Sequence, residues 1–132
     1  GENVATQEVE KAIDSFPGVS FSAVYGVAMP GSDGKVGMAA IVKDDQTPLD
    51  ISKLARHLKT SLPKYAVPLF VRFVPDFEFT ATHKIKKTNL KNQGYDLSKV
   101  GDGMYVLLPG SEKYETLNDD IYHNIAAGKY KF

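Results

Sequence analysis

The nine residues F-T-A-T-H-K-I-K-K, at positions 79–87, decide how this chain is interpreted. They follow a proline-punctuated apolar run, Y-A-V-P-L-F-V-R-F-V-P, at residues 65–75. Threonines and a histidine make a poor strand or helix interior, so we expect a surface loop that presents Lys84. Ile85 can pack into the domain and fix the loop while the neighbouring lysines point outward. Taken alone, such a run is most often a solvated basic turn.

Composition excludes several classes of protein. The 132 residues have the length of one domain and carry sixteen basic and sixteen acidic side chains. The balanced charge indicates neither a nucleic-acid platform nor a polybasic membrane anchor. There is no cysteine and the three histidines are scattered, so we expect no metal site. No apolar run approaches the roughly 20 residues of a membrane span. Because the first residue is not Met, we expect a piece of a longer protein.

The first half of the chain predicts a helix followed by two strands. Thr6 is a plausible N-cap, and Pro17-Gly18 stops a helix whose apolar stripe comprises Val9, Ala12, Ile13 and Phe16. Glu8 and Glu10 fall near its start, where a role in helix formation and packing is favoured over a role in catalysis or binding. Residues 19–28 and 36–43 predict an antiparallel strand pair joined by a loop rich in turn residues.

The following elements predict an α+β fold. A helix over residues 51–61, capped by Asp50 or Thr47, places His57 on its outer polar face. Residues 68–74 predict a third strand that Pro68 starts or places at an edge. Further on we expect a helical turn at 86–93, a strand within 104–108, and a helix at 117–127 capped by Thr116 or Asn118. The result is a small sheet of about three to five strands packed with helices.

Two ordered motifs resemble those of the adenylate-forming enzymes, the superfamily of acyl-CoA synthetases, luciferases and nonribosomal-peptide adenylation domains. L-P-K-Y-A-V-P at residues 62–68, a strand, and T-A-T-H-K-I-K-K at 80–87 resemble its signature L-P-x-Y-x-x-P followed by T-x-x-G-K-[IV]-x-R. The opening G-E-N-V-A-T-Q-E-V-E, residues 1–10, resembles G-x-x-[IV]-x-x-x-E-[IV]-E, which follows the inter-domain hinge. The resemblance implies the mobile C-terminal lid domain of such an enzyme.

The tail narrows this resemblance to one family. G-Y-D, M-Y-V-L and Y-E-T-L-N-D-D-I-Y-x-x-I-A-A-G, all within residues 94–128, resemble the C-terminus of the fatty acid transport proteins, which are very-long-chain acyl-CoA synthetases. We therefore expect one lid domain over residues 1–132. Its core, with the Lys84 loop, would span residues 1–92. Residues 93–132 would form a family-specific extension with an extra strand and helix.

The resemblance also implies roles for individual residues. Lys84 would be the adenylation lysine of an ATP-dependent fatty acid–CoA ligase acting on long or very long chains. After the lid rotates, Gly1, Glu2 and Asn3 would help to line the channel for CoA. Mg²⁺ is expected with ATP, ligated outside this chain. Lys87 stands where the usual motif has arginine, and a structural and an anion-facing role are equally open.

The chemistry explains why a lysine suits position 84. Attack of a fatty carboxylate on the α-phosphorus of ATP brings two anions together. A mobile ammonium between them reduces their repulsion and stabilises the charge that develops on the phosphate. Lysine is a compact point charge on a long stem, and it need not lose its proton here.

Two hypotheses follow. In the first, the partner of this domain is the N-terminal adenylation domain of the same chain, and the parent is an intracellular, membrane-associated ligase involved in lipid transport. The 132 residues alone would bind no ATP or CoA and would be inactive. In the second, a non-catalytic module docks an acidic partner or a membrane surface through a basic patch, Lys84 to Lys91. The first requires Lys84 alone, whereas in the second any of these lysines can partly substitute.

Overall fold

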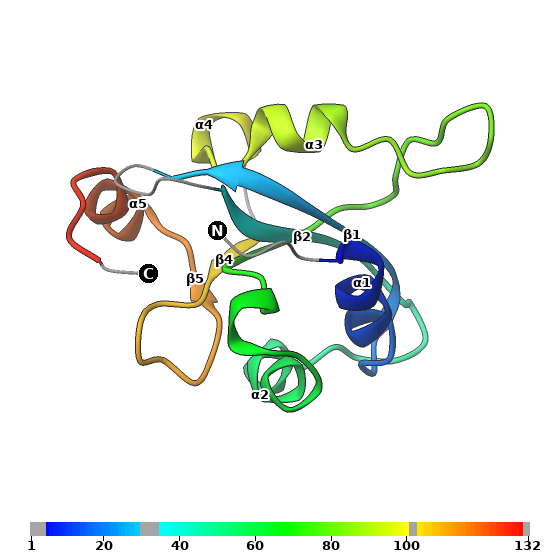
Figure 1. Cartoon of the computed structure of the whole chain (residues 1–132), viewed down its shortest axis with the longest axis horizontal. Helices are drawn as coiled ribbons and strands as arrows, with labels where there is room; N and C mark the ends of the chain where they lie inside the picture. The colour runs from blue at the N-terminus through cyan, green and yellow to red at the C-terminus, as the bar shows by residue number, and fades with distance from the viewer. Residues whose placement is uncertain (1–4, 30–34, 101–102, 131–132) are drawn as a thin grey trace.

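A five-stranded sheet with the strand order β1-β2-β3-β4-β5 forms the centre of the domain, and helices cover both of its faces (Figure 1). The structure, a computed structural model, describes residues 5–29, 35–100 and 103–130. The strands are β1 Val19–Ala28, β2 Lys35–Lys43, β3 Phe70–Phe73, β4 Met104–Val106 and β5 Glu115–Thr116. The helices are α1 Thr6–Asp14, α2 Ile51–Ser61, α3 Thr88–Gln93, α4 Leu97–Val100 and α5 Asp119–Ala126, with a 3-10 turn at Lys64–Ala66.

The sheet is mixed because α2 forms a crossover connection. β1 and β2 pair antiparallel, as the turn-rich loop between them predicts. β3 then runs parallel to β2, and β4 and β5 continue antiparallel beyond it. A parallel neighbour requires a long connection, which α2 provides. The predicted α+β class is confirmed. β3 is an interior strand, and Pro68 lies just before it, where a missing N–H costs no ladder hydrogen bond.

Alternation along the strands builds two cores. One face packs against α1 and α2, through Val9, Ile13, Leu54 and Leu58. The other face carries Tyr25, Met38 and Phe70, and α3, α4 and α5 lie against it. Figure 1 shows α3 and α4 above the sheet and α1 and α2 below it.

Helix ends bear out some predictions and correct others. α2 has the predicted bounds, and the Asp50 side chain accepts from the Ser52 amide, so Asp50 rather than Thr47 is the cap. Asn118 rather than Thr116 caps α5 by accepting from the Ile121 amide. The prediction for Thr6 was wrong: it is the first residue of α1, and Ala5 precedes it without a side-chain cap.

The prediction that His57 lies on the outer polar face of α2 was wrong. Its Nε2 lies 3.0 Å from the Ala12 carbonyl oxygen and 3.0 Å from the Ser15 hydroxyl. Its ring packs against Phe16 at 5.2 Å between centroids. The end of α1 therefore covers this face of α2, and His57 joins the two helices.

Most of the buried residues beyond Gln93 belong to the core on the α3 side, whereas Tyr114 belongs to the core on the α1 and α2 side. Met104, Val106, Leu117 and Ile125 are all buried in the same cluster as Phe70. The Tyr95 ring stacks on Phe70 with centroids 4.3 Å apart and planes within 4°. The expected additional strand and helix are present as β4 and α5. Two further elements, α4 and β5, were too short to be predicted from periodicity.

Tyr114 ties this C-terminal segment to the start of β3. Its ring is buried and its hydroxyl donates to the Pro68 carbonyl. Burial raises the pKa of Tyr114 well above its usual range. We expect Tyr114→Phe to lower the free energy of unfolding by about 1–3 kcal/mol, because it leaves a buried carbonyl without its donor. Thermal unfolding of the 132-residue chain measures this loss.

Tyr25→Phe is the matched control. Tyr25 is equally buried and faces the charge of Arg72, but its hydroxyl makes no hydrogen bond of normal geometry with the described residues. We expect Tyr25→Phe to change the stability by less than about 1 kcal/mol. Burial raises the pKa of Tyr25 to about 12 against the opposing charge of Arg72. A tyrosine of the unfolded chain ionises near pH 10, about two pH units below Tyr25 of the folded domain. Tyr25 therefore makes the stability fall as the pH rises from about 10 to about 12. Equal losses at neutral pH in both variants would contradict this account.

Candidate active site

The lysine loop, residues 79–85, is closed at its base by hydrogen bonds. Phe79 and Ile85 form an antiparallel bridge. The Thr80 amide donates to the Lys84 carbonyl at 2.7 Å, and just outside the loop the Lys86 amide donates to the Glu78 carbonyl at 2.8 Å. The base therefore has the form of a short hairpin, which gives the exposed turn a defined shape.

Threonine side chains order the interior of the turn. The Thr80 hydroxyl accepts from the Lys84 amide at 3.1 Å and lies 3.1 Å from the Thr82 hydroxyl. The His83 amide donates to the Thr80 carbonyl at 3.0 Å. His83 has a φ of +63°, in the left-handed region where glycine is most at ease. This explains why the motif that the loop resembles has glycine there, and histidine reaches the same conformation.

Lys84 follows the exposed turn of this loop and, as predicted, its side chain is exposed. The loop, yellow-green in Figure 1, projects at the upper right beyond α3. Ile85 is half-buried and packs against the core on that side, whereas Lys84 is exposed. No described carboxylate forms an ion pair with its ammonium group. Lys84 is therefore an exposed charge on a hydrogen-bonded loop, available to groups outside the domain.

Lys87 has the opposite environment. Its ammonium group lies 2.9 Å from Glu10 Oε2 and 2.7 Å from the Val24 carbonyl oxygen. Glu10 Oε2 also accepts from the Val24 amide at 2.7 Å. Of the two roles left open for Lys87, the contacts are those of the structural one. Glu10 packs α1 onto the sheet, as favoured from the sequence, but its pairing with Lys87 was not foreseen.

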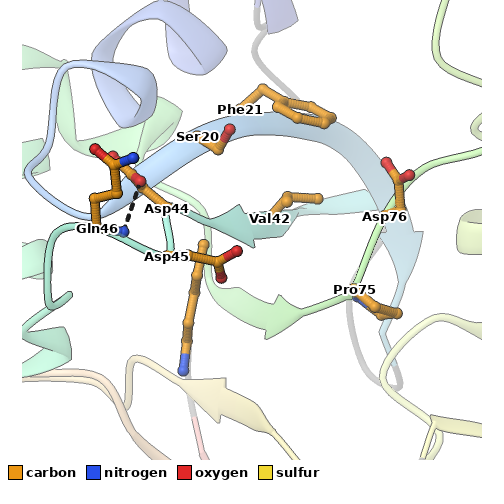
Figure 2. Close-up of a pocket in the computed structure, with 9 residues that line it drawn as sticks. Ser20, Phe21, Val42, Asp44, Asp45, Gln46, Pro75 and Asp76 are labelled. Atoms are coloured by element: carbon orange, nitrogen blue, oxygen red, sulfur yellow. Dashed lines mark hydrogen bonds between the residues drawn. The ribbon is translucent and has the colours of Figure 1, made fainter.

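One surface hollow, beside the end of β2, does not suit a nucleotide. Figure 2 shows Asp44 and Asp45 at one end of it and Asp76 at the other, with Phe21 and Val42 between them. The backbone amide of Gln46 donates to the Asp44 carboxylate at 2.9 Å. Three carboxylates, opposed in this hollow by Lys43 alone, would repel the phosphates of ATP.

The described ranges contain no group of three or more side chains able to hold a metal ion. Nor do they include a helix long and apolar enough to cross a membrane. Gly1, Glu2 and Asn3, the candidates for the CoA channel, lie outside the described residues. Lys84 is therefore the only predicted site residue that the structure places.

Comparison with known families decides the class of this domain. Residues 8–84, more than half of the chain, match the AMP-binding enzyme C-terminal domain. The chain belongs to this family. The match begins in α1 and ends at Lys84, so it includes both Glu10 and the turn of the lysine loop.

The sequence similarity of this AMP-binding C-terminal domain to curated relatives extends over most or nearly all of its length. It is 37% identical over 131 residues to long-chain fatty acid transport protein 6 of Mus musculus, covering 99% of this chain and 21% of the relative. It is 42% identical over 117 residues to a very long-chain fatty acid transport protein of Cochliobolus heterostrophus, covering 86% of this chain and 18% of the relative. The chain thus spans about a fifth of the length of these relatives.

The fold is also found in solved structures. The domain resembles part of a fatty acyl CoA synthetase from Mycobacterium tuberculosis with a TM-score of 0.64 and 33% identity. That similarity covers 74% of this chain and 19% of the synthetase. The α+β architecture is therefore that of the C-terminal domain of adenylate-forming enzymes.

Proposed function

We propose that this domain supplies Lys84 to the adenylation step of a larger acyl-CoA ligase that activates long or very long fatty acids. The observation that carries the proposal is the position of Lys84. Its side chain is exposed on a hydrogen-bonded loop, at the last residue of the AMP-binding match. The similarity to fatty acid transport proteins and to a fatty acyl CoA synthetase supports a fatty acid as the acid substrate.

In this proposal the fatty carboxylate attacks the α-phosphorus of ATP and pyrophosphate leaves. Lys84 brings a positive charge to the place where two anions meet, and stabilises the charge that develops on the phosphate. A charge without an ion-pair partner in the described part of its own domain is free for this use. The binding sites for ATP, Mg²⁺ and the acyl chain would lie on the N-terminal domain of the same chain.

The second half-reaction transfers the acyl group to the thiol of CoA. The lid would rotate so that Lys84 leaves the site, and Gly1, Glu2 and Asn3 would come to line the CoA channel. A glycine in such a channel allows the backbone to approach a narrow ligand closely. The parent protein would be intracellular and associated with a membrane, in keeping with its relatives among fatty acid transport proteins.

The alternative, a basic docking patch from Lys84 to Lys91, has no support. Lys87 is paired with Glu10 and turned towards β1, which removes a central cation from the patch. Lys84, Lys86 and Lys91 remain exposed, but charged side chains on a surface are ordinarily just solvated.

The full-length protein tests the proposal. We expect exchange between pyrophosphate and ATP that depends on a long-chain fatty acid, and CoA thioester formation in the same preparation. The 132-residue chain alone should show neither, because in this proposal the sites for ATP and the acyl chain lie on the N-terminal domain. Exchange by the isolated domain, or none by the intact protein with any long or very long fatty acid, would contradict the proposed function.

A further inference from the structure

We propose that Glu10 and Lys87 are positioning residues for Lys84, acting through a clamp on the outer edge of β1. The edge clamp consists of Glu10, Lys87 and the backbone of Val24. The inference rests on the proposed function, because it concerns where Lys84 stands during adenylation.

The clamp uses backbone groups that the sheet leaves free. β1 is an edge strand, and Val24 lies opposite Ala39 of β2. The Val24 amide donates to Glu10 Oε2, and its carbonyl accepts from Lys87 Nζ. In an antiparallel pair, alternate residues direct these groups away from the partner strand. Glu10 and Lys87 therefore pair with each other and also hydrogen-bond the free backbone groups of Val24 at this edge.

Partial burial makes this ion pair costly to break. The side chains of Lys87 and Glu10 are 26% and 19% exposed, so the pair differs from the freely solvated pairs that contribute little. Removal of one partner leaves the other partly desolvated without its counter-charge. The clamp should therefore hold one geometry rather than fluctuate as a surface pair does.

The clamp fixes one root of the lysine loop. Lys87 follows Lys84 by three residues and immediately precedes α3. At the other root, the rings of Phe77 and Phe79 lie 5.3 and 6.5 Å from Phe21. Phe21 is three residues before Val24 on β1. Both roots of the loop are thus attached to a short stretch of the same strand, and a shift of Lys87 would displace Lys84.

The far end of α3 is held separately. Arg72 of β3 donates to the Gln93 side chain at 2.7 Å. On the opposite face of the sheet, the Ser22 hydroxyl donates to Asp14 at 2.7 Å, which fixes the end of α1 against β1. Glu10 therefore joins two elements that are each already docked, so α1 and the lysine loop would move as one body when the domain rotates.

The test uses the full-length protein with Lys87→Met and Glu10→Gln, and measures the two half-reactions separately. We expect the rate of adenylation to fall by about 10- to 100-fold, as a displacement of a catalytic group by about 1 Å can cost. Thioester formation from pre-made acyl adenylate should stay within about twofold, because Lys84 takes no part in it. Lys87→Arg should restore most of the adenylation rate, because it keeps the charge facing Glu10. Lys91→Met, which removes an exposed lysine of α3, is the matched control and should leave both rates unchanged.

A double variant separates positioning from any independent effect. If Lys87 acts only through Lys84, adding Lys87→Met to Lys84→Ala should slow adenylation no further than Lys84→Ala alone. Parallel loss in both half-reactions, or full additivity in the double variant, would overturn the positioning role. An unchanged adenylation rate in Lys87→Met would overturn it too. A failure of the proposed function is distinct: Lys84→Ala itself would then leave adenylation intact.

Discussion

Lys84→Ala in the full-length protein is expected to lower the overall rate of acyl-CoA formation by about 10²- to 10³-fold, the cost of removing one preorganised electrostatic contact at a developing charge. The lysine loop keeps its shape in this variant, because its closing hydrogen bonds run through backbone groups and the Thr80 hydroxyl. The loss would therefore report the charge itself. Steady-state thioester production at saturating substrates measures it.

Two variants show whether position matters as well as charge. Lys86→Ala removes an exposed lysine two residues away and should keep the rate within about twofold, the range of a surface substitution remote from the chemistry. Lys84→Arg keeps a positive charge but spreads it over a planar group, so we expect only partial activity. Equal losses in Lys84→Ala and Lys86→Ala would favour a diffuse basic patch and contradict the role assigned to Lys84.

Phe70→Ala is expected to lower the free energy of unfolding by about 3–5 kcal/mol, the usual cost of truncating a buried aromatic ring. Phe70 lies in the interior strand β3 and is fully buried. Its ring also carries the stacked ring of Tyr95, so the cavity would undermine the C-terminal segment. Denaturant unfolding of the 132-residue chain measures the loss, which is a large share of the roughly 5–15 kcal/mol of a typical domain.

Phe79→Ala is the matched control for that loss. Phe79 is 48% exposed at the base of the lysine loop, so the same truncation removes far less buried surface. We expect it to cost less than about 1.5 kcal/mol. Similar losses in the two variants would contradict the place given to Phe70 in the core on the α3 side.

Periodicity predicted the elements that bury a regular pattern of side chains. β1 and α2 have the predicted bounds, because alternation and an apolar helical stripe extend over their whole lengths. β5 has two residues and α4 has four, which is too little for any period to appear. The extent of β3 was overestimated, because an apolar run does not show where its ladder of hydrogen bonds begins.

Contacts that depend on register could not be predicted. Glu10 and Lys87 are 77 residues apart and meet only because both reach Val24 on the sheet edge. Arg72 stands within an apolar run of the sequence, and its burial could not be predicted from that run. It lies opposite Ala40, which in turn lies opposite Ala23, so two small side chains leave room for its long one. The exposed position of Lys84 on a loop was predictable because a loop motif marks it locally.

The most direct test of the central claim separates the half-reactions of Lys84→Ala in the full-length protein. One assay follows fatty-acid-dependent exchange between pyrophosphate and ATP, and the other follows thioester formation from pre-made acyl adenylate. We predict that exchange collapses while thioester formation continues near the wild-type rate. Exchange at the wild-type rate would contradict the account, because Lys84 would then carry no charge that the adenylation step needs.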